Sequence, residues 1–318
     1  MKATVIGCGR WGSFIAWYLD HIGHEVTLYG REGSERMQAF LQTRSNGLVT
    51  LKPRVRLTCD LREALESELI CISVGSQGLA ALMAQIAACG VSGKTFVLCM
   101  KGIEVGTNRR LSQIAAEAVG EGNDIAVWLG PGHVQEFLAG VPNCMVIDSE
   151  SEAVKERLIA QLSGGLIRFY YGTDLTGNEI GAAAKNVVGI AAGMLDGMGV
   201  SSLKGALMSR GTREIARLIA AMGGSERSAY GLCHLGDYEA TVFSKYSHNR
   251  RFGELFVTGQ TYSELAEGDA TVRALCAMAE KTGVELPICQ TVHAVLHEGA
   301  DAGEAMSRLF MRSLKHEF

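Results

Sequence analysis

The sequence predicts a doubly wound α/β domain at the N-terminus followed by an all-α domain. In the first half, short apolar or β-branched runs alternate with helix-length amphipathic segments, which is typical of a parallel sheet covered on both faces. After residue 171 the strand pattern stops and apolar residues recur at helical spacing. The 318 residues also exceed the usual size of one domain. We therefore expect domains at 1–172 and 173–318, joined tightly near Tyr171–Thr173 with a cleft beside the junction.

The expected strands follow one another through the first half. They are Lys2–Ile6, Glu25–Tyr29, Val55–Thr58, Leu69–Val74, Thr95–Cys99, Ile125–Leu129, Cys144–Ile147 and Ile167–Tyr171. Helices are expected between them at Trp11–Ile22, Ser34–Thr43, Leu79–Ala88, Leu111–Val119 and Glu152–Leu162. The second half predicts helices at Thr176–Met194, Leu203–Met222, Thr271–Lys281 and Gln290–Leu296. Gly283 is an expected helix stop and Pro287 an expected helix start. We interpret Arg308–Phe318 as a frayed helix end.

Composition excludes several classes of protein. With 47% hydrophobic and 20% charged residues the chain is globular, and a net charge of -4 gives no broad basic field for nucleic acid. The nine cysteines form no C-x-x-C pair, which favours a reducing, cytoplasmic location over a disulfide framework. No uncharged apolar run reaches the ~20 residues of a membrane span. No His, Cys, Asp or Glu set has metal-ligand spacing, so we expect no metal.

A glycine-rich motif follows the first expected strand. Gly7, Gly9 and Gly12 form G-x-G-x-x-G at the start of the first helix. In a dinucleotide-binding turn, the first glycine permits the sharp turn, the second lets the backbone approach the pyrophosphate, and the third allows close helix–strand packing. The alternative is that these are ordinary turn glycines. The strand–turn–helix context favours a Rossmann-like nucleotide site.

The end of the second expected strand bears on the choice of dinucleotide. An acidic residue there binds the ribose hydroxyls of NAD, whereas an arginine accepts the 2′-phosphate of NADP. The chain has Arg31 followed by Glu32. We therefore expect NADP with NAD tolerated, the alternative being that Arg31 is solvated surface.

Further segments, taken together, resemble the NAD(P)-dependent glycerol-3-phosphate dehydrogenase family over nearly the whole chain. The segments are GCGRWG at 7–12, MKGIE at 100–104, GPGHVQE at 130–136, GAAAKN at 181–186, LGD at 235–237 with Thr241 beyond it, NRRFG at 249–253, EG at 267–268 and GVELPI at 283–288. Tryptophan inside the glycine loop is far more specific than the glycines alone. The order of the matches makes chance an unsatisfactory explanation.

The resemblance implies a catalytic pair, Lys185 and Asp237. Hydride transfer between an alcohol and a ketone needs a group that exchanges the hydroxyl proton, and a lysine in that role must have its pKa brought towards the working pH. On spacing alone, the better interpretation of Lys185 is a solvated lysine on an alanine-rich helix, because Ala182 and Gly189 share its face as close-packing residues. Asp237 is expected to orient Lys185 or the substrate across the cleft, and its alternative is a helix N-cap.

The resemblance also implies binding residues and a reaction. The substrate-binding residues would be Lys101, Gly130, Asn186, Thr241, His248, Asn249 and Arg250. The cofactor-binding residues would be Gly7, Gly9, Arg10, Trp11, Gly12, Arg31, Lys101, Arg250 and Glu267. The expected reaction is reduction of dihydroxyacetone phosphate to sn-glycerol 3-phosphate with NADP or NAD, supplying phospholipid synthesis. The expected partner is a small phosphorylated molecule, without nucleic acid or stable membrane insertion, and a homodimer is compatible with the sequence.

Three positions depart from the family pattern and leave alternatives open. His248 stands where the family usually has an arginine that grips the substrate phosphate, and Gly75 and Gly132 stand where it generally has proline and serine. Arginine offers a permanent bidentate grip that neutral histidine lacks, although Arg250 or protonated His248 can compensate. The alternatives are therefore a dehydrogenase for another phosphorylated or anionic carbonyl compound, and a catalytically silent dinucleotide-binding module.

Overall fold

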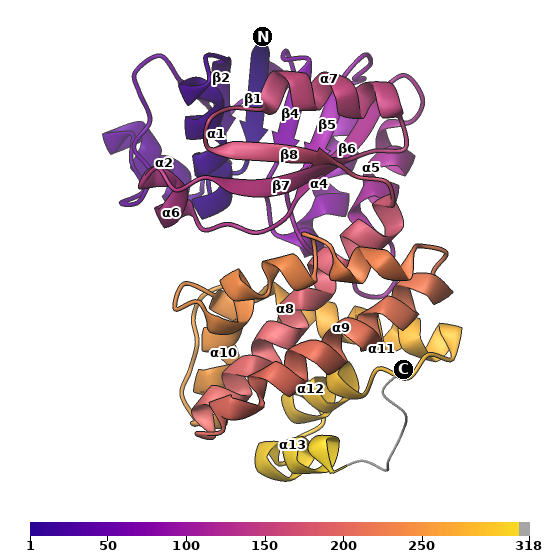
Figure 1. Cartoon of the computed structure of the whole chain (residues 1–318). Helices are drawn as coiled ribbons and strands as arrows, with labels where there is room; N and C mark the ends of the chain where they lie inside the picture. Colours follow the sequence, from indigo (N-terminus) through magenta and orange to yellow (C-terminus); the bar gives the residue numbers. More distant parts are fainter. Residues whose placement is uncertain (312–318) are drawn as a thin grey trace. The chain divides into compact units, whose positions relative to one another are not determined.

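The computed structural model describes residues 1–311, which divide into two compact units. The first unit comprises Met1–Lys101 and Arg109–Leu175, and the second comprises Gly102–Asn108 and the described residues from Thr176 onward (Figure 1). The short segment Gly102–Asn108 thus leaves the first unit and returns to it. The predicted frayed end at Arg308–Phe318 lies largely outside the described residues.

The first unit is built on a single mixed sheet, which has eight strands within the described residues. The strands are β1 (Lys2–Ile6), β2 (Glu25–Tyr29), β3 (Arg56–Thr58), β4 (Leu69–Ile72), β5 (Thr95–Leu98), β6 (Asp124–Leu129), β7 (Asn143–Asp148) and β8 (Ile167–Tyr171). Their order is β3-β2-β1-β4-β5-β6-β7-β8. Neighbours are parallel except β6 and β7, which are antiparallel. The predicted doubly wound α/β fold is confirmed. The prediction that all strands are parallel is wrong for one pair, because β7 runs antiparallel to β6.

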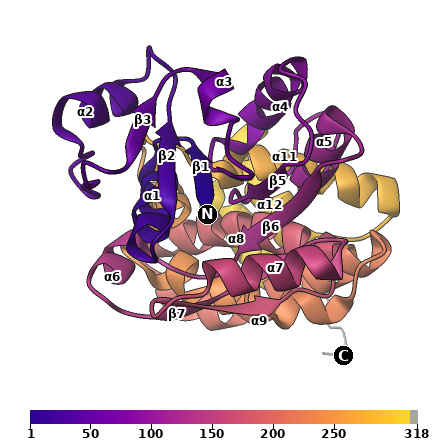
Figure 2. The ribbon, with the colours of Figure 1, turned by 90° about the horizontal axis from the view of Figure 1, so that it is seen from above.

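Helices cover both faces of this sheet. They are α1 (Arg10–His21), α2 (Glu35–Thr43), α3 (Leu61–Ala64), α4 (Leu79–Ala88), α5 (Leu111–Val119), α6 (Val134–Leu138) and α7 (Glu152–Leu162), with a short turn η1 (Ser76–Gly78). Figure 2 shows α4 and α5 on one face and α1 and α7 on the other. The Tyr18 hydroxyl of α1 donates to the Leu162 carbonyl of α7 at 2.7 Å. Because both faces are covered, all residues of β4 are buried.

The second unit is helical. Its helices are α8 (Leu175–Gly197), α9 (Lys204–Ala221), α10 (His248–Val257), α11 (Glu267–Thr282), α12 (Pro287–His297) and α13 (Ala302–Phe310), joined in part by short turns η2 (Ser201–Leu203), η3 (Glu226–Tyr230), η4 (Leu235–Asp237) and η5 (Glu239–Phe243). Gly283 ends α11 in the left-handed conformation with φ 70°, and Pro287 begins α12, both as predicted. Helices α10 and α13 are not among the helices predicted from the sequence.

Helix α8 is the centre of the second unit. Every residue from Gly177 to Leu195 is buried, so the helix is surrounded on all sides. Its run of glycine and alanine lets neighbouring segments approach its backbone closely. A helix buried all round exposes no polar face, and any charged residue on it must find partners inside the protein.

No helix within residues 1–311 is long and apolar enough to cross a bilayer.

Candidate active site

The glycine loop of the first unit has the geometry that a bound pyrophosphate needs. Gly7 follows β1 with φ +115°, and a Cβ added to it would lie 2.0 Å from the Ser73 carbonyl oxygen. A Cβ on Gly12 would lie 2.0 Å from the Gly7 carbonyl oxygen. Gly9 precedes α1, whose N-terminus has neither a side-chain cap nor an acidic residue in its first turn. A helix start of this kind favours an anion, so the loop fits a dinucleotide.

Other predicted residues of the first unit lie at the start of α1 or on the loops that follow β2, β5 and β6. Arg10 and Trp11 begin α1, and the Trp11 ring lies 5.1 Å from that of Phe14. Arg31 follows β2 and is exposed, consistent with either of its two interpretations. The Lys101 ammonium donates to the Gly130 carbonyl at 2.7 Å, joining the loops after β5 and β6.

Gly132 has a steric explanation. It has φ +150°, and an added Cβ would lie 2.3 Å from the Phe137 ring. A serine at this position would therefore require Phe137 to move. In this chain, the packing of Phe137 accounts for glycine where the family pattern has serine.

A buried ion pair lies at the middle of α8 in the second unit. The Lys185 ammonium is 2.9 Å from the Asp237 carboxylate and donates to the Thr241 hydroxyl at 2.6 Å. The Thr241 hydroxyl donates in turn to the Asp237 carbonyl at 2.7 Å. Lys185 is 7% exposed and Asp237 1% exposed. Lys185 is therefore not a solvated lysine, and its ammonium is held between the Asp237 carboxylate and the Thr241 hydroxyl.

Asp237 and Thr241 reach Lys185 from two consecutive turns. Asp237 is the last residue of the 3-10 turn η4, and Thr241 lies in the π-helical turn η5. Interpreting Asp237 as a helix N-cap is therefore wrong. The four-residue spacing of Asp237 and Thr241 brings both side chains to the same lysine.

An asparagine bridge lies beside this ion pair. The Asn249 amide donates to the Asn186 side-chain oxygen at 3.0 Å and accepts from the Gly268 N–H at 2.9 Å. Asn249 thus joins α8, α10 and the start of α11, where Glu267 also lies. The structure brings these predicted residues together next to Lys185.

His248 begins α10, one residue before the asparagine bridge. Its Nδ1 is hydrogen-bonded to the Tyr262 hydroxyl, and the Ser247 hydroxyl caps the helix by accepting from the Arg250 N–H at 3.2 Å. His248 therefore lies close to the residues that contact Asn186. The Tyr262 contact holds its ring at the start of α10.

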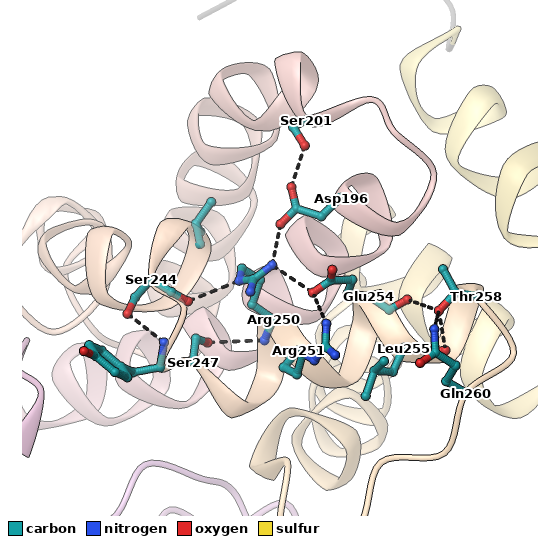
Figure 3. Close-up of polar contacts among 12 residues, drawn as sticks. Asp196, Ser201, Ser244, Ser247, Arg250, Arg251, Glu254, Leu255, Thr258 and Gln260 are labelled. Carbon is teal, nitrogen blue, oxygen red and sulfur yellow. Dashed lines mark hydrogen bonds and ion pairs between the residues drawn. The ribbon is translucent and has the colours of Figure 1, made fainter.

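Arg250 lies elsewhere in the second unit. Its guanidinium binds Asp196 at 2.8 Å and Glu254 at 3.1 Å, and donates to the Ser244 carbonyl at 3.1 Å (Figure 3). Asp196 comes eleven residues after Lys185 on α8, or about 16 Å along the helix axis. The structure therefore does not bring the Arg250 guanidinium to Lys185, and Arg250 is not placed to compensate for His248.

The Asp196 cluster is an ion-pair network of its own. The Lys204 ammonium is 2.7 Å from the Asp196 carboxylate, to which the Ser201 hydroxyl also donates, at 2.6 Å. Burial tends to raise the pKa of Asp196, but the hydrogen bonds from Lys204, Ser201 and Arg250 outweigh it and lower that pKa. This network ties the end of α8 to α9 and α10.

A buried histidine and a buried tyrosine beside the Lys185–Asp237 ion pair are absent from the residues predicted from the sequence. His234 and Tyr238 flank Asp237, and both are 0% exposed. The missed signal is their four-residue spacing, which lets two aromatic side chains meet on a helical turn.

Comparison with known proteins agrees with this geometry. Residues 2–155 match the family model for the NAD-dependent glycerol-3-phosphate dehydrogenase N-terminus, and residues 174–307 match the model for its C-terminus. The chain belongs to the NAD-dependent glycerol-3-phosphate dehydrogenase family. The resemblance that the motifs predict is confirmed, and with it the prediction of an NAD(P)-dependent oxidoreductase acting on a CH–OH group.

Relatives within this family align over the full length of the chain. Glycerol-3-phosphate dehydrogenase (NAD(P)+) of Streptomyces coelicolor is 36% identical, covering 100% of this chain and 98% of the relative. The enzyme of the same name from Thiobacillus denitrificans is 37% identical, covering 100% of both. A crystal structure of glycerol-3-phosphate dehydrogenase from Coxiella burnetii superposes with a TM-score of 0.91 at 28% identity, covering 98% of this chain and 99% of that one. The two-part fold is therefore that of this family.

Proposed function

We propose that this chain reduces dihydroxyacetone phosphate to sn-glycerol 3-phosphate, reversibly, with NADPH or NADH. The observation that carries the proposal is the buried pair of Lys185 and Asp237 in a chain whose full-length relatives are named for this reaction. The product is a precursor for glycerophospholipid synthesis. We assign the dinucleotide to residues 1–172 and the substrate to the helical residues 173–318.

The residues divide the work as follows. A dinucleotide held at the start of α1 would supply the hydride for the substrate carbonyl carbon. Lys185 donates a proton from its ammonium to the carbonyl oxygen as the alkoxide charge develops, and it recovers that proton from solvent. Asp237 and Thr241 hold the ammonium in place, and the start of α1 binds the pyrophosphate. Asn186, Asn249 and His248 are proposed to bind the substrate.

The test is an absorbance assay at 340 nm with purified protein, dihydroxyacetone phosphate and either dinucleotide. We expect oxidation of NADPH, with NADH also used, and loss of turnover in Lys185→Met while NADPH binding persists. If the absorbance at 340 nm does not change for the wild-type protein with either dinucleotide, the proposal is wrong. Tight NADPH binding without turnover of any carbonyl compound would favour a silent binding module instead.

A second candidate is a dehydrogenase for another phosphorylated or anionic carbonyl compound. It is favoured by His248 at the start of α10 and by the engagement of Arg250 with Asp196. A charge-assisted hydrogen bond contributes about 1.5–3 kcal/mol, so His248→Arg should lower KM for dihydroxyacetone phosphate roughly ten- to a hundredfold. An unchanged KM, together with faster turnover of a different 2-oxo compound, would support this second candidate.

Location and assembly are further proposals. We place the protein in the cytoplasm, because none of its nine cysteines, all within the described residues, forms a disulfide. We also propose a homodimer. Size-exclusion chromatography with light scattering gives the oligomeric state directly.

A further inference from the structure

A fully buried histidine lies against α8 in the second unit. His234 Nδ1 is 2.8 Å from the Gly181 carbonyl oxygen, and its Nε2 is 2.7 Å from the Tyr238 hydroxyl. A carbonyl oxygen can only accept, so Nδ1 must carry the hydrogen and donate it. In a neutral ring Nε2 is then the acceptor, and the Tyr238 hydroxyl donates to it. The two contacts together assign one tautomer.

The surroundings of His234 keep the ring neutral. Burial lowers the pKa of His234 to about 4, and the Lys185 charge acts in the same direction, although the Gly181 hydrogen bond and the Asp237 charge oppose it. The charged groups facing the ring are thus Lys185 of α8 and Asp237 of η4. From α9, a hydrogen bond with the Gly211 backbone also opposes the lowering of this pKa. The neutral form therefore persists across the working pH of a cytoplasmic enzyme.

The histidine ties together the two segments that carry the catalytic pair. Gly181 is one helical turn before Lys185 on α8, and His234 comes three residues before Asp237. A Cβ added to Gly181 would lie 3.0 Å from the His234 Cβ, so the histidine packs directly on the helix backbone. The bond from Nδ1 to the Gly181 carbonyl therefore fixes the approach of η4 to α8 one turn away from the ion pair.

We propose that His234 is a positioning residue for the reaction, which sets the separation between the Lys185 ammonium and the Asp237 carboxylate. Tyr238 supports it by holding the Nδ1–H tautomer. The inference rests on the proposed function of Lys185 as proton donor. In this role His234, which is not one of the reacting groups, controls how tightly Lys185 holds its proton.

The expected effect follows from the distance dependence of the ion pair. Widening the 2.9 Å separation by about 1 Å, at an effective dielectric constant of about 20, weakens the hold on the proton about tenfold. Activity in the reducing direction requires protonated Lys185, so it falls at high pH when that proton is lost. A tenfold lower affinity of Lys185 for its proton moves the alkaline decline in activity about one pH unit lower.

The experiment compares pH profiles of kcat for dihydroxyacetone phosphate reduction between pH 5.5 and 10. His234→Leu removes both hydrogen bonds, and His234→Asn keeps an N–H donor near the Nδ1 position. His24→Leu is the matched control, because His24 Nε2 is likewise 2.9 Å from a carbonyl oxygen, that of Gln161, in the first unit. Circular dichroism establishes that each variant is folded.

We expect the alkaline fall to move about one unit lower in His234→Leu and to return towards the wild-type position in His234→Asn. KM for NADPH should stay unchanged, and His24→Leu should keep the wild-type profile. Wild-type and His234→Leu profiles that coincide after scaling would show a purely structural role and overturn the proposal. A profile for His234→Asn displaced as far as that of His234→Leu would also overturn it.

A second measurement does not depend on activity. Nitrogen-15 NMR of protein labelled at histidine distinguishes the two neutral tautomers, and the His234→Asn spectrum identifies the His234 signals. We expect the Nδ1–H tautomer from pH 5.5 to 9. An Nε2–H tautomer or an imidazolium in this range would overturn the proposal even if the wild-type enzyme is active. An inactive wild-type protein with the expected tautomer would instead mark failure of the proposed function.

Discussion

Replacing Asp237 by asparagine tests the ion pair most directly. Asparagine keeps the shape of the side chain but leaves the Lys185 ammonium buried without its carboxylate partner at 2.9 Å. Both side chains are almost fully buried, at 9% and 1% exposure, so solvent screens the loss poorly. Removing one partner of such a pair destabilises a protein by about 3–5 kcal/mol. We expect this loss near pH 6.5, together with a large fall in kcat.

The loss has an upper limit that depends on pH. A buried lysine without a counterion can release its proton, and from the ordinary lysine pKa of about 10.4 this costs about 1.4 kcal/mol per pH unit below 10.4. The limit is about 5 kcal/mol at pH 6.5 and about 1 kcal/mol at pH 9.5. In the variant the unfolded chain binds more protons than the folded one, so its stability rises with pH. The difference from wild type should therefore shrink to about 1 kcal/mol at pH 9.5.

The assay is urea unfolding at pH 6.5 and 9.5, followed by circular dichroism at 222 nm. Tryptophan fluorescence is unsuitable, because all three tryptophans, Trp11, Trp17 and Trp128, lie in the first unit. The matched control is the double variant Lys185→Met/Asp237→Asn, which removes both charges and should show no such pH dependence. Equal destabilisation of the single variant at the two pH values would refute the reasoning.

Two further predictions concern a buried carboxyl and the glycine loop. Burial raises the pKa of Glu214 to about 7. Hydrogen bonds from the Ile288 and Cys289 N–H groups at the start of α12 act in the opposite direction but are outweighed. The folded chain thus binds this proton more tightly, and up to about 3 kcal/mol of stability present below pH 4.5 is lost as pH rises through 7. Glu214→Gln should remove that slope in urea unfolding at pH 5 and 8; an unaltered slope would contradict it. Gly12→Ala, whose Cβ would clash with the Gly7 carbonyl, should raise the NADPH dissociation constant at least about tenfold in fluorescence titration, whereas Gly33→Ala, with open space around it, should not.

The sequence predicts most elements of the first unit because their signals are local. Strands β1, β2 and β8 and helices α4, α5 and α7 begin and end at the predicted residues. Alternation of apolar runs with amphipathic helices is a property of neighbouring residues, so it can be read without the tertiary structure. The antiparallel β7 could not be found in this way, because strand direction depends on where the chain crosses the sheet.

Helix α10 shows the limit of such patterns. Its sequence, HNRRFGELFV, begins with polar residues that obscure an apolar face. Asn249 contacts Asn186 of α8 and Gly268 of α11, and Arg250 contacts Asp196 of α8, all of which are distant in sequence. Helix packing decides which of these residues contacts Asn186 and which contacts Asp196, and the spacing of residues within α10 does not reveal it.

By itself, the sequence determined the glycine-rich turn between β1 and α1, the two-part organisation and, through ordered motifs, the family. These depend on glycines and short segments whose constraints are local. Only the tertiary structure decided that Lys185 is buried, that Asp237 and Thr241 hold it, and that Arg250 is engaged elsewhere. It also showed His234 against α8. The physical reason is that burial and ion pairing arise between segments far apart in the chain, so the same lysine on the same alanine-rich helix would be solvated surface without η4 and η5 packed against it.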